Sequence, residues 1–318
     1  MLSRLADNLY WHGRYLERAE DLARLVMVNT HLNLDLPAGL SAGWEPLVRI
    51  TGKGPMFHAR HDHAGEREVV HFLLADDDNP GSVKSALAMA RENLRAARDL
   101  LPREVWEQMN GLYLNSRHKL SGSISRRGRD EYLRGLILSC QQIAGTLLGS
   151  MSHDHAYDFI LIGRHIERAD MITRILEVRG HDLLPEAPND LTPYDSVQWM
   201  SVLKSLTAYQ MYRRHVRMRV SGNDVLRFLL RDEAFPRSVT FCLDALEDLL
   251  DGLPGDDSRA LDSVAGIRDT LAQTRVAGLR GRRLGELMDK LQSEIAGVDS
   301  AVRSTWFLDP AAAQASAT

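Results

Sequence analysis

A charged motif that occurs twice is the feature of this chain that most restricts its fold. Residues 13–25 read GRYLERAEDLARL and residues 163–175 read GRHIERADMITRI, with six of thirteen positions identical. A second pair follows at a similar offset, because FLLADDDNPGSV (72–83) and FLLRDEAFPRSV (228–239) share seven of twelve positions. Two matches in the same order predict a tandem duplication.

The duplication predicts one helical unit over residues 1–307, with a first repeat at about 1–150 and a second at about 151–307. We expect the repeats to be related by an approximate pseudo-two-fold axis; whether the two charged motifs then meet in space stays open. The tail at 308–318 offers little apolar surface to bury and is predicted to be disordered.

Helical periodicity covers most of the chain. Apolar residues recur at spacings of three and four, and aromatic residues make up only 6% of the sequence. We therefore predict an all-α bundle of helices, with breaks where proline and glycine are dense. The predicted helices cover residues 4–34, 82–100, 103–116, 127–150, 155–180, 196–220, 223–231, 236–252, 257–275 and 281–306. Pro80 and Pro236 are each predicted at the first position of a helix, where a backbone N–H would have no partner.

Composition and charge exclude several classes of protein. The chain is 44% hydrophobic and 26% charged, as soluble globular proteins are, and its formal charge of −4 does not indicate nucleic acid or an anionic membrane as partner. No apolar run approaches the roughly 18 residues of a membrane span. The first residues, MLSRLADNLYWHGR, are interrupted by charge too early for a secretory signal. With only Cys140 and Cys242, both in apolar stretches, we expect no disulfide and a cytoplasmic protein.

The charged motif forms one face of a helix. At about 100° per residue, Arg14, Glu17 and Arg18 share a charged sector, opposite an apolar one. Gly13 also lies in this sector, where glycine costs about 1 kcal/mol relative to alanine if exposed, so a backbone or a ligand is expected to approach there. The second copy repeats the layout. The candidate site residues are Arg14, Glu17, Arg18, Arg24, Arg164, Glu167, Arg168 and Arg174.

Three interpretations of the charged face compete with an ordinary solvated surface. The motifs form paired salt bridges between the repeats, with local pairs such as Arg14 with Glu17 and Glu20 with Arg24 also available. Alternatively, the arginine forks hold a carboxylate or phosphate ligand. In the third interpretation, Glu17 or Glu167 is a general acid or base with a raised pKa. Neighbouring arginines would lower that pKa, so we favour the salt bridges first and the ligand second.

Other candidate sites are weaker. His58, His61, His63 and His71 cluster, but without a cysteine or an HExxH helix they are interpreted as loop histidines, and no metal site is predicted. In the basic stretch YRRHVRMRV (212–220), Arg213 and Arg217 share a face that could dock an acidic partner, although a solvated face is favoured. No phosphate-binding loop or nucleophile elbow is present in the sequence.

The segments MLSRLADNLYWHGRYLERAEDLARL, ILIGRHIERADMITRILEVR and VLRFLLRDEAFPRSVTFCL together resemble the bacterial alpha-E domain family. The resemblance extends to about residue 307 and implies an all-helical fold named for its Glu-Arg motif. The motif positions carried over to this chain are Arg14, Glu17, Arg18, Arg164, Glu167 and Arg168. Such proteins are typically encoded beside, or fused to, an ATP-grasp protein of the amide-ligase type, often with a transglutaminase-like protein as a further neighbour.

The resemblance implies a role in making, attaching or trimming a peptide or amide. Our leading hypothesis is a non-catalytic helical partner of an ATP-grasp ligase; this chain stands alone, so we expect a separate partner subunit. No cofactor is expected in this chain, and ATP and magnesium would bind to the ligase. The alternative is an enzyme or small-molecule binder that holds a carboxylate or phosphate with its paired motifs. Whether the chain forms a homo-oligomer stays open.

Overall fold

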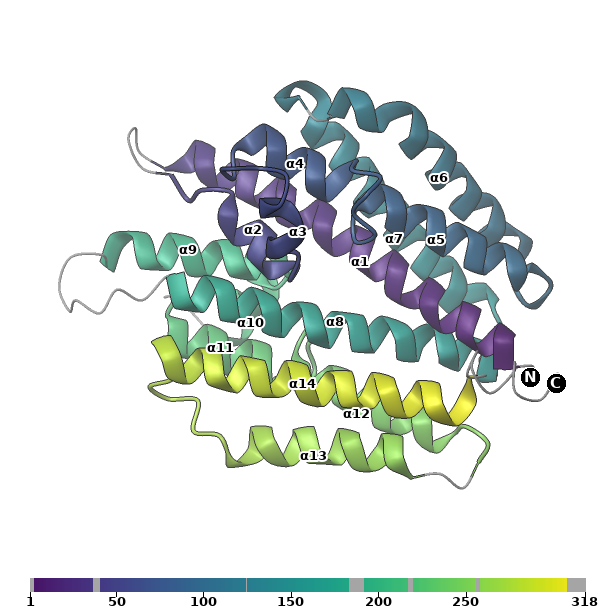
Figure 1. Ribbon diagram of the computed structural model, residues 1–318. Helices are drawn as coiled ribbons and strands as arrows, with labels where there is room; N and C mark the ends of the chain where they lie inside the picture. Colours follow the sequence, from purple (N-terminus) through teal and green to yellow (C-terminus); the bar gives the residue numbers. More distant parts are fainter. Residues whose placement is uncertain are drawn as a thin grey trace.

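The chain folds into helices alone over the residues that the structure describes (Figure 1). The structure is a computed structural model, and it describes residues 3–36, 41–123, 125–182, 192–216, 220–255 and 258–307. No strand occurs in these ranges, so the all-α prediction is confirmed. The tail predicted to be disordered, residues 308–318, lies outside them.

Two long helices run side by side through the middle of the molecule. They are α1 (Ser3–Asp35) and α8 (His155–Asp182), and each carries one copy of the charged motif (Figure 1). On one side, α5 (Val83–Ala96) and α7 (Arg126–Ser150) pack on α1, and α6 (Arg103–Ser123) packs on both of them. These four helices form the first group.

The second group surrounds α8 in the same manner. Here α12 (Val239–Asp251) and α14 (Gly281–Trp306) pack on α8, and α13 (Arg259–Gln273) packs on both of them (Figure 1). Buried apolar side chains of both groups belong to one continuous cluster, with Leu9 and Ile162 of the central helices fully buried within it. The two groups therefore share a core along α1 and α8.

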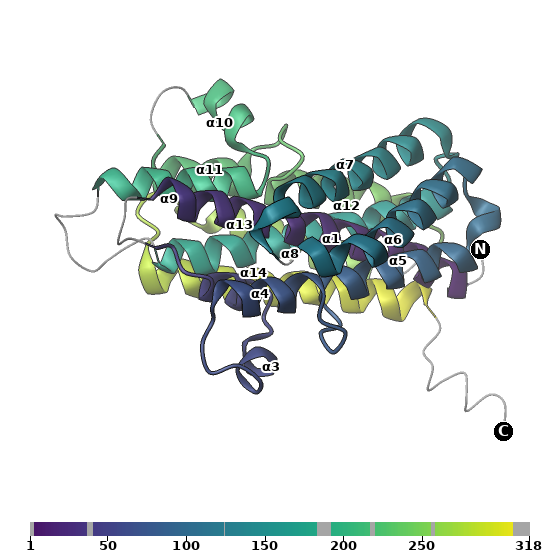
Figure 2. The same cartoon turned by 90° about the horizontal axis from the view of Figure 1, so that it is seen from above.

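Short helices fill the connections and account for most of the wrong predictions. They are α2 (Glu45–Ile50), α3 (Gly54–His58), α4 (Glu66–Leu74), α9 (Thr192–Ser205), α10 (Tyr209–Val216) and α11 (Gly222–Arg231). The first three were not predicted, because helices this short show too few turns for a period to emerge. The predicted helix at 196–220 is divided into α9 and α10 by Thr207, which has a positive φ of 55°. Figure 2 shows α3 and α10 projecting from opposite edges.

Serine residues, and not the prolines, cap the first turns of α5 and α12. Helix α5 begins at Val83, and Ser82 Oγ accepts a hydrogen bond from the backbone N–H of Ser85 at 3.2 Å. Helix α12 begins in the same way, with Ser238 Oγ accepting from the N–H of Phe241 at 3.1 Å. The predicted starts at Pro80 and Pro236 were wrong, because a capping hydroxyl satisfies an N–H at the helix end and proline only lacks one.

None of the helices in the described ranges is both long enough and apolar enough to cross a membrane.

Candidate functional site

The two charged motifs meet where α1 crosses α8, and glycine makes the crossing possible. A Cβ atom on Gly13 would lie 2.1 Å from the carbonyl oxygen of Ile160, and one on Gly163 would lie 2.1 Å from that of Tyr10. Any side chain at either position would push the two backbones apart. Gly13 thus lies in the charged sector because another helix covers it there, as the sequence led us to expect.

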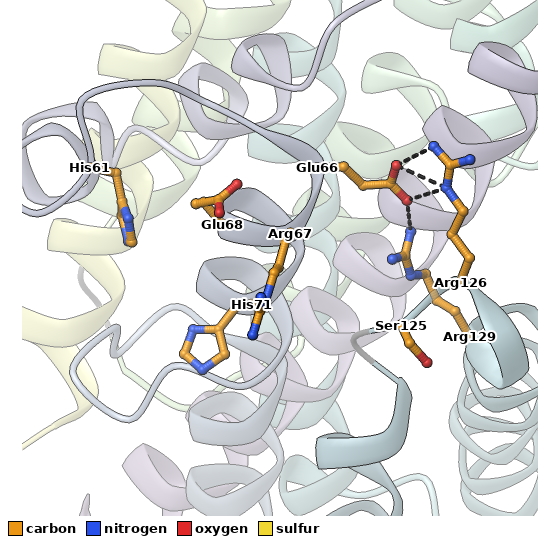
Figure 3. A pocket seen from close by; sticks show the side chains of 8 residues that line it. All are labelled: His61, Glu66, Arg67, Glu68, His71, Ser125, Arg126 and Arg129. Carbon is orange, nitrogen blue, oxygen red and sulfur yellow. Dashed lines mark hydrogen bonds and ion pairs between the residues drawn. The ribbon is translucent and has the colours of Figure 1, made fainter.

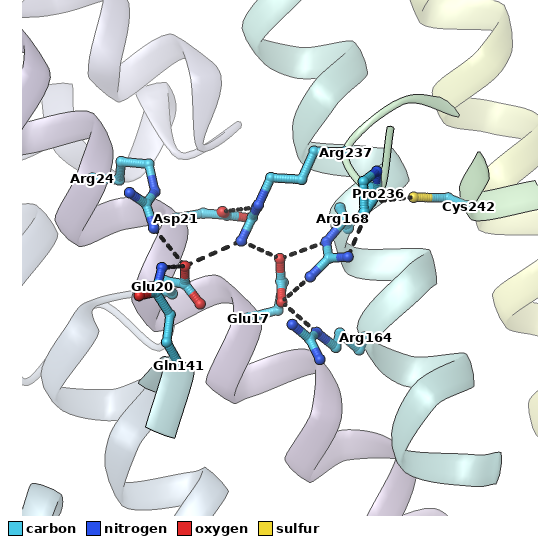
Figure 4. A network of polar contacts seen from close by, with 10 residues as sticks. All are labelled: Glu17, Glu20, Asp21, Arg24, Gln141, Arg164, Arg168, Pro236, Arg237 and Cys242. Carbon is cyan, nitrogen blue, oxygen red and sulfur yellow. Dashed lines mark hydrogen bonds and ion pairs between the residues drawn. The ribbon is translucent and has the colours of Figure 1, made fainter. Parts of the chain in front are cut away.

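Glu17 of the first motif is bound by arginines of the second. Arg168 donates from Nε to Oε1 at 2.8 Å and from Nη2 to Oε2 at 3.0 Å, and Arg164 Nε donates to Oε2 at 3.0 Å (Figure 4). Arg168 Nη1 also donates to the carbonyl oxygen of Pro236, which ties this pair to the start of α12. The Glu17 side chain is only 2% exposed.

Glu167 of the second motif is bound by arginines of the first in the reciprocal arrangement. Arg18 donates from Nε to Oε1 at 2.5 Å and from Nη2 to Oε2 at 2.8 Å, and Arg14 Nε donates to Oε2 at 2.8 Å. The local Arg14–Glu17 pair that the spacing made available is therefore not formed, because both residues bond to the opposite helix. Arg14 Nη1 reaches further, to Asp299 Oδ1 of α14 at 2.5 Å.

The arginines keep both glutamates ionised. Burial alone would raise the pKa of Glu167, but Arg18 and Arg14 outweigh it and lower that pKa to about 2. Burial opposes ionisation of Glu17 too, and Arg168, Arg237 and Arg164 hold its pKa well below its ordinary value. A general acid or base near neutral pH needs a pKa close to that pH, so this geometry gives no support to catalysis by either carboxylate.

Arg24 and Arg174 end the two motifs with local pairs. Arg24 Nη2 donates to Glu20 Oε1 at 2.5 Å, and Arg174 Nε donates to Asp170 Oδ2 at 2.8 Å, each four residues along its helix. The local pair expected from the Glu20 spacing is thus present. All eight motif residues singled out from the sequence lie in or beside one network between α1 and α8.

Arg237 completes the network and was missed in the sequence. It lies just before α12, with its guanidinium 2.9 Å from Glu17 Oε1, 3.2 Å from Glu20 Oε1 and 2.8 Å from Asp21 Oδ1 (Figure 4). A signal was available, since the matching position of the first FLL…SV segment is Gly81. Arg237 stands inside the shared P-x-S-V ending of the two segments, where the first copy has glycine, and this marked a difference between the two halves.

Asp21 carries a raised pKa. Burial raises it most, Arg237 lowers it, and the charges of Glu17 and Glu20 raise it further, to about 7. Only Oδ1 of Asp21 is bonded to Arg237, and Oδ2 is buried without a hydrogen-bond partner among the described residues. Asp21 is therefore the group of this network that can take up a proton near neutral pH.

Two cavities flank the network. One of about 270 Å³ lies between α1, α7 and α8, and it is lined mostly by apolar groups together with Cys140 and Gln141. Burial raises the pKa of Cys140 well above its ordinary value, so this thiol is no ready nucleophile. The other, of about 230 Å³, lies on the opposite side against the arginines of α1 and the turns that follow α2 and precede α5.

The clustered histidines have separate neighbours in the structure. His58 Nε2 lies 3.0 Å from Glu45 Oε1, and the ring of His61 lies 4.6 Å from that of Phe57. Across the described part of the chain, no group of three or more His, Cys, Asp or Glu side chains could hold a metal ion. An open pocket of about 690 Å³ separates His61 and His71 from Glu66, which Arg126 and Arg129 bind (Figure 3).

The possible docking arginines lie apart from the network. Arg213 is exposed on α10, with its guanidinium carbon 5.9 Å from the ring centroid of Tyr209. Arg217 lies outside the described residues. The structure thus leaves Arg213 available on the surface, and the docking hypothesis stays a prediction.

The chain matches the model of a known domain family along most of its length. The chain belongs to the Alpha-E family, described as a predicted alpha-helical domain with a conserved ER motif, whose model matches residues 1–307. The resemblance read from the sequence is thereby confirmed.

Relatives of the chain are longer proteins. It is 26% identical to an uncharacterized protein of Mycobacterium bovis and 25% identical to one of Mycobacterium tuberculosis (strain ATCC 25618 / H37Rv), in each case over 94% of this chain and 36% of the relative. The chain thus spans about a third of the length of the curated relatives it matches. No solved structure matches it.

Proposed function

We propose that this protein is a non-catalytic helical partner of an ATP-grasp ligase that forms peptide or amide bonds. The observation that carries the proposal is the state of Glu17 and Glu167: both are buried, ionised and bound by arginines of the opposite helix. Carboxylates held in this way fix a crossing of helices and are poor catalysts. The choice of partner rests on the resemblance to the alpha-E family.

The greater length of the relatives supports a role in association with other protein domains. In them the region like this chain makes up 36% of a longer polypeptide, so the domain is joined there to additional sequence. A domain whose polar centre is internally paired acts most simply by presenting its surface. We propose that ATP and magnesium bind to the ligase, and that a transglutaminase-like protein is a further partner.

We also propose that the chain arose by tandem duplication, with its halves related by an approximate pseudo-two-fold axis. Three observations support this: the repeated motifs, the reciprocal bonding of Glu17 and Glu167, and the matching order of packing in the two groups of helices. The two glycines at the crossing repeat the same reciprocity. Under this proposal, the axis passes between Gly13 and Gly163.

Affinity purification from the native host tests the partnership. We would purify the tagged chain with and without ATP and identify bound proteins by mass spectrometry, expecting an ATP-grasp protein in near-equal amount. Arg213→Glu reverses a charge on the exposed face of α10 and is expected to lower the recovery. Arg98→Glu reverses the charge of another exposed arginine, far from Arg213 in the sequence, and is the control. Recovery of this chain alone, at a depth where weak complexes are detected, would rule out a stable partner.

A further inference from the structure

The cavity of about 230 Å³ beside Glu167 has an unusual lining. Four basic side chains line it, from three parts of the chain: Arg14 and Arg18 of α1, Lys53 of the turn after α2, and Arg174 of α8. Its carboxylates are already bonded, Glu167 to Arg14 and Arg18, and Asp170 to Arg174. Lys53 has no carboxylate partner among the described residues, so one cation faces the cavity uncompensated.

The other half of the chain fills the corresponding place with its own side chain. There Arg237 enters between Glu17, Glu20 and Asp21. The sequence match pairs Arg237 with Gly81, and Gly81 lines the cavity. A Cβ atom on Gly81 would lie 3.9 Å from Lys53 Cε and 3.3 Å from Asn79 Oδ1, so a side chain at this position would lie directly beside the lysine.

The two halves also differ in how their additional cation is compensated. Arg237 lies among the carboxylates of Glu17, Glu20 and Asp21. Two of these carboxylates also pair with the motif arginines, which are Arg24, Arg164 and Arg168. In the cavity lining, the residue aligned with Asp21 is Met171, which carries no charge, and Lys53 is present as a cation from outside the motif. A cation such as Arg237 suits the first place. Arg237 is bonded to three carboxylates there, whereas Lys53 has no carboxylate partner among the described residues, so the second place suits an anion.

The size of the surplus selects the anion. Each arginine of the lining has a carboxylate partner, Arg14 with Asp299 of α14 in addition to Glu167, and Lys53 is left with its single positive charge unpaired among the described residues. A carboxylate carries a single negative charge at neutral pH and matches it. A phosphate monoester carries about −1.5 to −2 and would leave negative charge uncompensated in a partly buried site.

We propose that this cavity binds the carboxylate of a small molecule, with Lys53 as its principal cation and the outer N–H groups of Arg18 and Arg174 beside it. Both side chains line the cavity, and the printed carboxylate bonds use Nε and Nη2 of Arg18 and Nε of Arg174, which leaves further N–H donors on each guanidinium. Glu167 holds Arg18 in position for the ligand. The site is independent of the proposed ligase partnership, and either can fail while the other stands.

The test is titration of the full-length protein with butyrate at constant ionic strength, followed by the amide resonances of Gly52, Lys53 and Gly81. We expect saturable shifts confined to these turns and to the cavity face of α8. Lys53→Met should raise the Kd by at least about tenfold, because a hydrogen bond to a charged group is lost. Lys84→Met removes an equivalent charge, 37% exposed and paired with Asp77, and should leave the Kd within about twofold.

A second variant blocks the cavity without changing its charge. Gly81→Gln should abolish the butyrate shifts while the rest of the amide spectrum stays that of the wild type. Absence of saturable shifts in the wild-type protein, or equal affinity in the Lys53 and Lys84 variants, would overturn the proposal. Inorganic phosphate in place of butyrate should bind more weakly, and tighter binding of phosphate that depends on Lys53 would overturn the assignment to a carboxylate.

Discussion

Glu17 gathers three arginines in the interior of the protein, and this arrangement makes it more sensitive to substitution than any surface glutamate. Arg164 and Arg168 pair with its two oxygens, and Arg237 pairs with Glu17 in addition to Glu20 and Asp21. Removing one member of a buried ion pair is costly because the remaining charge stays desolvated. The same reasoning applies to Glu167 and its two arginines.

Glu17→Gln is therefore expected to lower the free energy of unfolding by about 3–5 kcal/mol. Glu104→Gln, at an exposed position of α6, is the matched control and should change it by less than about 0.5 kcal/mol. Urea denaturation followed by circular dichroism measures both. If Glu17→Gln were as stable as the control, the Glu17 pairs would not be structural, and the motif would have to be explained by a ligand.

Asp21 gives the network a dependence on pH. Its pKa is about 7 in the folded protein against an ordinary value of 3.8, so between these values the folded state binds the extra proton. Stability from this group is complete below about pH 4 and is lost as the pH rises towards 7, by at most about 1.4 kcal/mol per pH unit. Asp21→Asn removes this dependence.

The measurement is urea denaturation of wild type and Asp21→Asn at pH 5 and pH 7.5. We expect the variant to gain stability relative to the wild type as the pH rises, because asparagine cannot acquire the buried charge. The glutamate pairs contribute equally to both proteins over this range, since the pKa of Glu167 is about 2 and that of Glu17 is also depressed. A stability difference that does not change with pH would contradict the assignment.

At the scale of helices, the crossing of α1 and α8 depends on backbone contact. Gly13→Ala or Gly163→Ala would place a methyl group 2.1 Å from a carbonyl oxygen of the facing helix, and backbone cannot yield there as a flexible side chain would. We expect each substitution to destabilise the protein by about 1–3 kcal/mol, measured as a fall in Tm. Displacement of the helices would also lengthen the ion pairs around both glutamates.

Gly135→Ala on α7 is the control for this prediction. Nothing lies within 4 Å of a Cβ atom there, and the position is exposed inside a helix. Alanine should stabilise the protein by up to about 1 kcal/mol through its higher helix propensity. A Gly13→Ala protein that gained stability as Gly135→Ala does would show that the two backbones can separate at little cost.

At the scale of the whole molecule, the two groups of helices share the core along α1 and α8. Neither central helix can leave without exposing buried carboxylates and apolar side chains of the other. We therefore expect thermal unfolding in a single transition, with calorimetric and van't Hoff enthalpies agreeing and near- and far-ultraviolet circular dichroism coinciding. Two resolved transitions would instead show that the halves are separate folding units.

Much of the architecture could be predicted because its signals are local. The periodicity of apolar residues locates the long helices, as with the predicted 281–306 and the observed Gly281–Trp306, although α6 continues to Ser123, beyond the predicted end at residue 116. Short helices such as α2 and α3 could not be found in this way, and neither could the break at Thr207, since a positive φ is rare at a β-branched residue and threonine gives no local signal for it.

By itself, the sequence determined that the chain is helical, that a charged motif occurs twice, and that a glycine in each copy admits a close neighbour. Each of these follows from the order of residues along one helix. Only the tertiary structure decided which charges meet. Glu17 bonds to arginines about 150 positions away, and Arg14, one helical turn from Glu17, bonds to Glu167 instead. It also decided that Arg237 fills one half and that a basic cavity remains in the other. Such outcomes depend on side chains that converge from separate helices and turns, and no spacing along the chain encodes the distance between them.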